Sequence, residues 1–103
     1  MNMELHLAQE FGAHLADGGA AADFRRTRIE PYTAIYPQIT LDFTGVRSAN
    51  SSFMNALIAG LVEQHGETIL DQIIFKGCNP VLRILVEAAI DLGVQKISGR
   101  IDA

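Results

Sequence analysis

The sequence predicts an α/β fold, a small domain with a mostly parallel or mixed central sheet of about four strands and about three helices. Short apolar runs that are typical of strands alternate with segments whose apolar residues recur every three or four positions, as in helices. Strands that alternate with helices in this way usually become parallel neighbours joined by right-handed crossovers. The chain of 103 residues has the length of one domain, and we expect residues 1–103 to form a single one.

The first half of the chain contains two predicted strands and one predicted helix. Residues 3–8 alternate apolar and polar side chains, which predicts a half-buried strand. Residues 20–30 predict a short helix that packs through Phe24 and ends at Pro31, because proline cannot continue the helical hydrogen bonds. Residues 38–43 are apolar and rich in β-branched side chains, which predicts a buried strand, and Gly45 permits a tight turn after it.

The helix predicted at residues 51–65 has the clearest amphipathic pattern. Its apolar side chains lie three and four positions apart and form one wide stripe, made of Phe53, Met54, Leu57, Ile58, Leu61 and Val62. Gly66 is a favourable residue immediately after a helix, and we expect the helix to end there. Residues 71–76 then predict a third strand.

A last helix is predicted to begin at Asn79 and Pro80, a favourable cap followed by a proline at the first helical position. We expect Gly93 to end this helix, since glycine is the commonest residue after a helix terminus. Residues 94–101 are then the candidate for a fourth strand at the edge of the sheet.

The same helix is apolar over most of its circumference. Its polar residues Arg83, Glu87 and Asp91 lie four positions apart and form one narrow stripe. A helix of this kind is covered on more than one side, either by its own domain or by a partner.

Charge and cysteine content limit the classes of partner. The net charge is −4 and the basic residues are mostly scattered, so we do not expect nucleic acid to be the main partner. Arg25, Arg26 and Arg28 form one local cluster, either a solvated helix face or the edge of an anion-binding or protein-binding surface. Cys78 is the single cysteine, which favours a reducing compartment. The N-terminus lacks the pattern of a signal peptide and no apolar run is long enough to span a bilayer, so we expect a cytoplasmic protein that does not bind a membrane.

No residue pattern indicates an enzyme, a cofactor or a metal site. Cys78 and Arg83 lie one residue closer together than in a phosphatase loop, and no glycines lie between them. His6, His14 and His65 are far apart in the sequence and lack the spacing of metal ligands. We therefore expect no catalytic residue.

The start of the helix at residues 51–65 is the candidate functional site. A buried strand ends at Asp42, and Ser51 and Ser52 then open the helix after a short loop. Free backbone N–H groups and the helix dipole stabilise a phosphate at such a position, so phosphorylation of one serine is one interpretation. The other is that a serine hydroxyl caps the helix. Asp42 either bonds to loop N–H groups or orients the serine loop.

The segment Leu41-Asp42-Phe43-Thr44-Gly45-Val46 with Asn50-Ser51-Ser52 resembles the phosphorylation region of STAS domains, the modules of sulfate transporters and anti-sigma-factor antagonists. Asn79-Pro80-Val81-Leu82 with Leu85 looks like a later helix start of those domains. Asn50, Phe53-Met54 and Ser48 replace the usual residues, and this version looks closer to the bacterial STAS-like family. Asp17-Gly18, Phe24-Arg25 and Pro31 also resemble residues of that family. The resemblance covers about residues 5–93 and implies an α/β STAS-like fold, with Ser51 as the kinase target.

Together these observations predict a non-enzymatic regulatory module that binds a protein partner. The resemblance implies partner switching with a histidine-kinase-type ATPase that acts as a serine kinase. We expect phosphorylation at Ser51 or Ser52 to weaken that contact, and the candidate contact residues are Asp42, Asn50, Phe53, Met54 and Asn55. The alternative is a constitutive interaction module or homodimer without phosphorylation, with the last helix and the Phe53-Met54 pair at the interface.

Overall fold

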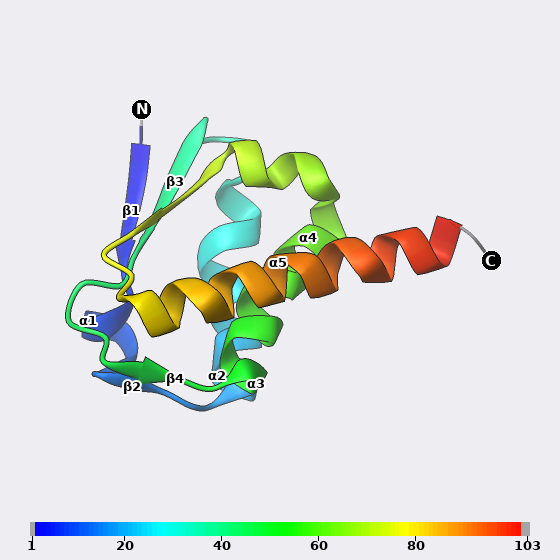
Figure 1. Ribbon diagram of the computed structural model, residues 1–103. Coiled ribbons are helices and arrows are strands. Elements are labelled where there is room, and N and C mark those ends of the chain that lie inside the picture. Colours follow the sequence, from blue (N-terminus) through cyan, green and yellow to red (C-terminus); the bar gives the residue numbers. More distant parts are fainter. Residues whose placement is uncertain (1, 102–103) are drawn as a thin grey trace.

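The computed structural model describes residues 2–101, which form two sheets of parallel strands and a set of helices (Figure 1). The strands are β1 (Asn2–His6), β2 (His14–Leu15), β3 (Gln38–Asp42), β4 (Ser48–Ala49) and β5 (Ile73–Lys76). The α-helices are α1 (Leu7–Phe11), α2 (Gly18–Phe24), α3 (Ser51–Met54), α4 (Gly60–His65) and α5 (Pro80–Ile101). Segments of π-helix are η1 (Arg25–Ile29) and η3 (Asn55–Ala59), and segments of 3-10 helix are η2 (Glu30–Tyr32) and η4 (Glu67–Asp71).

The predicted α/β class with parallel strands is confirmed. The main sheet has the order β1-β3-β5, and a second, smaller sheet pairs β2 with β4. All three strand pairs are parallel. The prediction of about four strands in one sheet missed the smaller sheet, because strands of two residues are too short to show a period of two.

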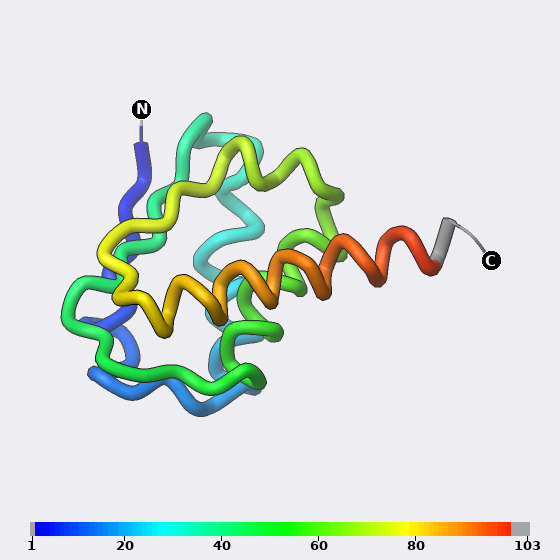
Figure 2. The backbone as a smooth tube through the Cα atoms, in the orientation of Figure 1, coloured from blue at the N-terminus to red at the C-terminus, as the bar shows by residue number. Residues whose placement is uncertain are grey.

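The helices gather on one side of the main sheet, and α5 runs across the molecule away from the N-terminal strand (Figures 1 and 2). The core between them is continuous and includes side chains from β1, β3, β5 and every α-helix. None of the helices in the described part of the chain combines the length and the apolar character needed to cross a bilayer.

The helix predicted at residues 51–65 is confirmed at both ends. α3, η3 and α4 follow one another without a break from Ser51 to His65, and Gly66 comes next with φ of 85°. A positive φ of this size suits glycine, which has no Cβ to clash. The apolar stripe of this helix lies in the core, as its spacing predicts.

The predicted edge strand at residues 94–101 is wrong, because α5 continues through Gly93 to Ile101. Gly93 is buried where α5 passes close to η3 and α4. A Cβ at this position would lie 2.8 Å from the Cβ of Val62 and 3.1 Å from the carbonyl oxygen of Ala59. Gly93 therefore permits a close approach between helices and does not end one.

The first predicted strand also ends earlier than expected, at His6 instead of residue 8. Leu7 begins α1 and is fully buried. Phe11 lies four positions later on the same helix and packs edge-on against the rings of Phe24 and Phe53, with centroids 5.2 and 5.0 Å away. The alternating residues 3–8 therefore belong to two elements, the end of β1 and the first turn of α1.

Candidate functional site

Two strand-to-helix junctions lie side by side at the candidate site. β2 and β4 pair in parallel, with Leu15 opposite Ala49, and a short connection leads from each strand into a helix, α2 or α3. The backbone N–H of Asn50 donates to the carbonyl of Leu15 at 2.9 Å, and its side-chain Nδ2 donates to the carbonyl of Ala16 at 3.0 Å. Asn50 therefore ties the start of α3 to the segment that precedes α2.

Asn50 is also the cap of α3. Its Oδ1 accepts a hydrogen bond from the backbone N–H of Phe53 at 2.8 Å. The interpretation in which a serine caps this helix is wrong, because Ser51 and Ser52 occupy the first two helical positions. Both serines are exposed, and neither hydroxyl has a hydrogen-bond partner among residues 2–101.

The two serines differ in their surroundings. A Cβ added to Gly18, the first residue of α2, would lie 2.6 Å from the Oγ of Ser52. The Ser52 hydroxyl therefore lies close to the start of α2.

Phe53 and Met54 were predicted to contact a partner, and the structure contradicts this. Both side chains are fully buried, and the Phe53 ring packs against Phe11. They belong to the core stripe of the helix, so a partner cannot reach them without unfolding it. Asn55 is half-buried and Asn50 is exposed, so these two predicted contact residues remain accessible.

Asp42 is buried at the end of β3 and belongs to a different surface. Its Oδ1 accepts a hydrogen bond from the backbone N–H of Thr44 at 2.9 Å. Hydrogen bonds from the side chain and backbone of Thr44 lower the pKa of the Asp42 carboxyl, so this group is ionised at neutral pH. Among the described residues its hydrogen bond and ion pair run to Thr44 and His6, Lys76 and Cys78 interact with its charge, and no interaction reaches Ser51 or Ser52. Asp42 shapes the turn after β3, as the interpretation of a loop N–H acceptor predicts.

The family comparison bears on these same residues. Residues 20–82 match the family model described as a STAS-like domain of unknown function (DUF4325). The chain belongs to this STAS-like family. The match includes Asn50, both serines and the start of α5, and it leaves β1 and most of α5 outside. The chain has no significant match among curated proteins, and none among solved structures.

The arginine cluster of this STAS-like domain does not form one anion-binding patch. Arg25 pairs with Glu30 at 3.0 Å and is mostly buried, whereas Arg28 pairs with Glu10 at 2.9 Å and lies over the Phe24 ring. Arg26 pairs with Asp23 on the same helix. Each guanidinium therefore has its own carboxylate.

Cys78 of the STAS-like domain is not an activated thiol. Burial raises the pKa of the Cys78 thiol, and the opposing effect of Arg83 is smaller. A nucleophilic cysteine needs a lowered pKa, so its environment opposes that role.

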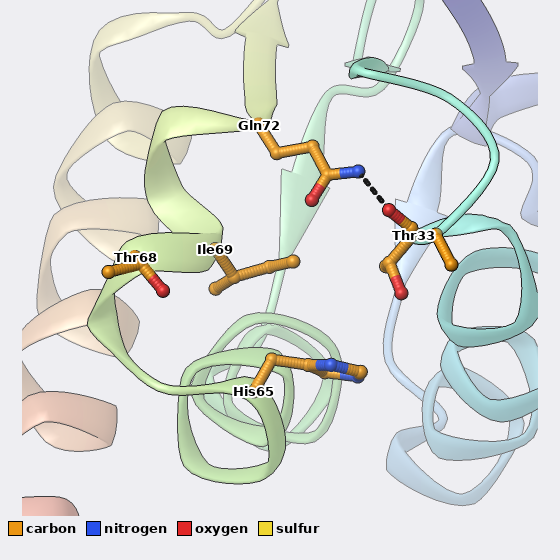
Figure 3. Close-up of a pocket in the computed structure, with 6 residues that line it drawn as sticks. Thr33, His65, Thr68, Ile69 and Gln72 are labelled. Carbon is orange, nitrogen blue, oxygen red and sulfur yellow. Dashed lines mark hydrogen bonds between the residues drawn. The ribbon is translucent and has the colours of Figure 1, made fainter.

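A small cavity lies between the loop after η2 and the η4 segment (Figure 3). Its volume is about 230 Å³, and its wall contains Thr33, Ala34, His65, Thr68, Ile69 and Gln72. The Nε2 of Gln72 donates to the carbonyls of Thr33 and Tyr36, so this side chain fixes the loop after η2 to the residue that follows η4. Most ligand pockets are larger, about 300–1,000 Å³. None of the site residues predicted from sequence lines this cavity.

Proposed function

We propose that this STAS-like domain is a non-enzymatic regulatory module that binds a protein partner through the surface at Asn50, Ser51, Ser52 and Asn55. In this proposal phosphorylation of Ser51 weakens the contact. One observation carries this proposal. Asn50 caps α3, so neither serine is needed as the cap and both serine hydroxyls are exposed.

The backbone at this position favours a phosphate. Asn50 accepts from the N–H groups of Phe53 and Met54, through its side chain and its carbonyl. The N–H groups of Ser51 and Ser52 precede these and have no acceptor in the described part of the chain. A phosphate on Ser51 lies near both groups and near the positive end of the helix dipole.

Ser51 is the preferred site because the Ser52 hydroxyl lies beside the start of α2. A Cβ at Gly18 would lie 2.6 Å from the Ser52 Oγ, so a phosphate on Ser52 has less room on the side that faces α2. A phosphate on Ser51 adds about −1.5 to −2 charges to the surface. Exposed Asp17, the cap of α2, already places a carboxylate at the neighbouring junction, so the added charge repels an acidic partner surface further.

The partner class rests on the resemblance to antagonist STAS domains, which implies a histidine-kinase-type ATPase that is also a serine kinase. Intact-mass spectrometry of the protein from its native host, with fragment mapping, tests the chemistry. We expect one added phosphate on Ser51, lost in Ser51→Ala and kept in the matched variant Ser52→Ala. Unmodified protein under all growth conditions, or a phosphate that persists in Ser51→Ala, contradicts the proposal.

The second step is a binding measurement with a candidate ATPase. Ser51→Asp should weaken the complex at least about tenfold, a change of about 1.4 kcal/mol in binding free energy. Ser51→Ala should bind like the unmodified protein. Equal affinity of Ser51→Asp and Ser51→Ala counts against control by charge.

A second candidate function is constitutive self-association through α5, and two exposed apolar side chains favour it. Val81 and Ile84 are 62% and 65% exposed and lie three positions apart on this helix. No ion pair joins Arg83, Glu87 or Asp91 to another described residue. In an antiparallel pair of α5 helices, the Arg83 end of one copy faces the Glu87 end of the other.

Size-exclusion chromatography with light scattering separates the two candidates. Self-association predicts a dimer that Ile84→Ser dissociates. Ile35→Ser is the matched control, because Ile35 is 64% exposed and lies outside α5. A monomer at all concentrations rejects self-association and favours the switch.

A further inference from the structure

We propose that Glu4, His6 and Asp42 form a binding site for a zinc-class divalent cation on the open face of the main sheet. These three residues are called the Glu4–His6–Asp42 cluster. Sequence spacing does not indicate this site, because two of its members come from β1 and the third comes from β3, far along the chain.

Strand register brings the cluster together. In the parallel pairing of β1 with β3, His6 lies opposite Asp42. Glu4 precedes His6 by two positions, and residues two apart on a strand project from the same face. Pairing of β3 with β5 places Lys76 on the other side of Asp42. The arrangement is therefore set by the most regular part of the backbone.

The donor atoms already lie close to one another. The His6 ring lies between the two carboxylates, with its Nε2 3.6 Å from the Oε1 of Glu4 and its Nδ1 3.3 Å from the Oδ2 of Asp42, and one of these two nitrogens would bind the ion. One donor atom from each residue can be chosen so that all three lie within 4.8 Å of one another. Ligands about 2.0–2.2 Å from a tetrahedral zinc ion are about 3.4 Å apart. Binding therefore requires rotation of Glu4 and His6, whose side chains are 46% and 45% exposed.

Asp42 supplies the fixed member of the cluster. Its side chain is 7% exposed, and the hydrogen bond from the Thr44 N–H holds Oδ1, which leaves Oδ2 directed toward His6. Outer-shell hydrogen bonds of this kind orient the carboxylate ligands of metals.

The donor set selects the class of ion. One imidazole and two carboxylates fit zinc and similar transition ions, with water at the fourth position. Magnesium and calcium prefer oxygen donors alone, so we expect them to compete weakly. The Nζ of Lys76 lies 3.8 Å from the Oε1 of Glu4 and competes for this carboxylate. Its side chain is 59% exposed and can turn into solvent when a cation binds.

The test is calorimetric titration of the full chain with zinc chloride. We expect one equivalent of zinc to bind. Loss of an outer-shell partner usually weakens metal binding by at least about tenfold, so His6→Ala, which removes a direct ligand, should weaken it by more than that. His14→Ala is the matched control, because His14 is also exposed but pairs with Ser48 in the smaller sheet. Lys76→Met should tighten binding, since it removes the competing cation.

Circular dichroism of each variant checks that the fold is kept. Absence of zinc binding overturns the proposal, as does equal weakening by His6→Ala and His14→Ala. The site lies on the main sheet and the serines on α3, so loss of zinc binding in His6→Ala with unchanged phosphorylation of Ser51 separates this inference from the proposed function.

Discussion

Replacement of Asn50 by alanine tests the structural basis of the candidate site. The substitution removes the cap of α3, the hydrogen bond from Phe53 N–H to Asn50 Oδ1 at 2.8 Å. Loss of a side-chain cap costs about 1 kcal/mol of helix or protein stability. It also removes the bond from Asn50 Nδ2 to the Ala16 carbonyl at 3.0 Å, which contributes about 0.5 kcal/mol because this bond is solvent-exposed. We expect the free energy of unfolding to fall by about 1.5 kcal/mol in total.

Urea denaturation followed by circular dichroism measures this change. With a denaturant slope of about 1–3 kcal/mol per molar urea, the midpoint falls by about 0.5–1.5 M and the slope stays unchanged. Asn50→Asp separates the two bonds, because its carboxylate still caps the helix but cannot donate to Ala16. We expect it to lose about a third of the Asn50→Ala effect.

Ser51→Ala is the matched control for the cap. Its hydroxyl has no hydrogen-bond partner among the described residues, so removal should change stability by less than about 0.5 kcal/mol. A loss in Ser51→Ala as large as that in Asn50→Ala would refute the reasoning, because the serine would then be the cap.

Two further predictions concern α5 and the cysteine that precedes it. Gly93→Ala places a Cβ 2.8 Å from the Cβ of Val62 and should cost about 1–3 kcal/mol in urea denaturation. Gly99→Ala on the same helix meets nothing within 4 Å and should stabilise by up to about 1 kcal/mol, so an equal response of the two variants contradicts the close approach. Because burial raises the pKa of Cys78, the protonated thiol stabilises the fold below the pKa of the unfolded chain, and this contribution is lost as pH rises above that value. Iodoacetamide at about pH 8.5 should therefore alkylate the folded protein more slowly than the urea-unfolded chain, and equal rates would count against a buried thiol.

The two proposed sites place different demands on the same fold. The serine surface depends on a junction between the smaller sheet and α3, which Asn50 holds through its bonds to Leu15 and Ala16. The Glu4–His6–Asp42 cluster depends on the register of β1 against β3 in the main sheet. A variant that weakens one site should therefore leave the other intact, since well-separated sites act nearly independently.

Local sequence determined those elements whose signals come from neighbours in the chain. The stripe from Phe53 to Val62 predicted a helix whose start at Ser51 and end at His65 are confirmed. Asn79 and Pro80 predicted the start of α5, and the Leu82 N–H donates to the Asn79 side chain at 2.9 Å. Helix periodicity and capping act over a few residues, so the sequence alone reveals them.

Tertiary structure decided the roles of residues whose partners lie elsewhere in the chain. Ser51 and Asn50 are both good cap residues by type, and the pairing of β2 with β4 is what places Asn50 at the cap position. Glycine is common just after a helix end, yet Gly93 lies inside α5, where the absence of a Cβ allows close packing against Val62. His6 and Asp42 meet only through strand register. Contacts between distant segments depend on how the elements pack, and no local pattern carries that information.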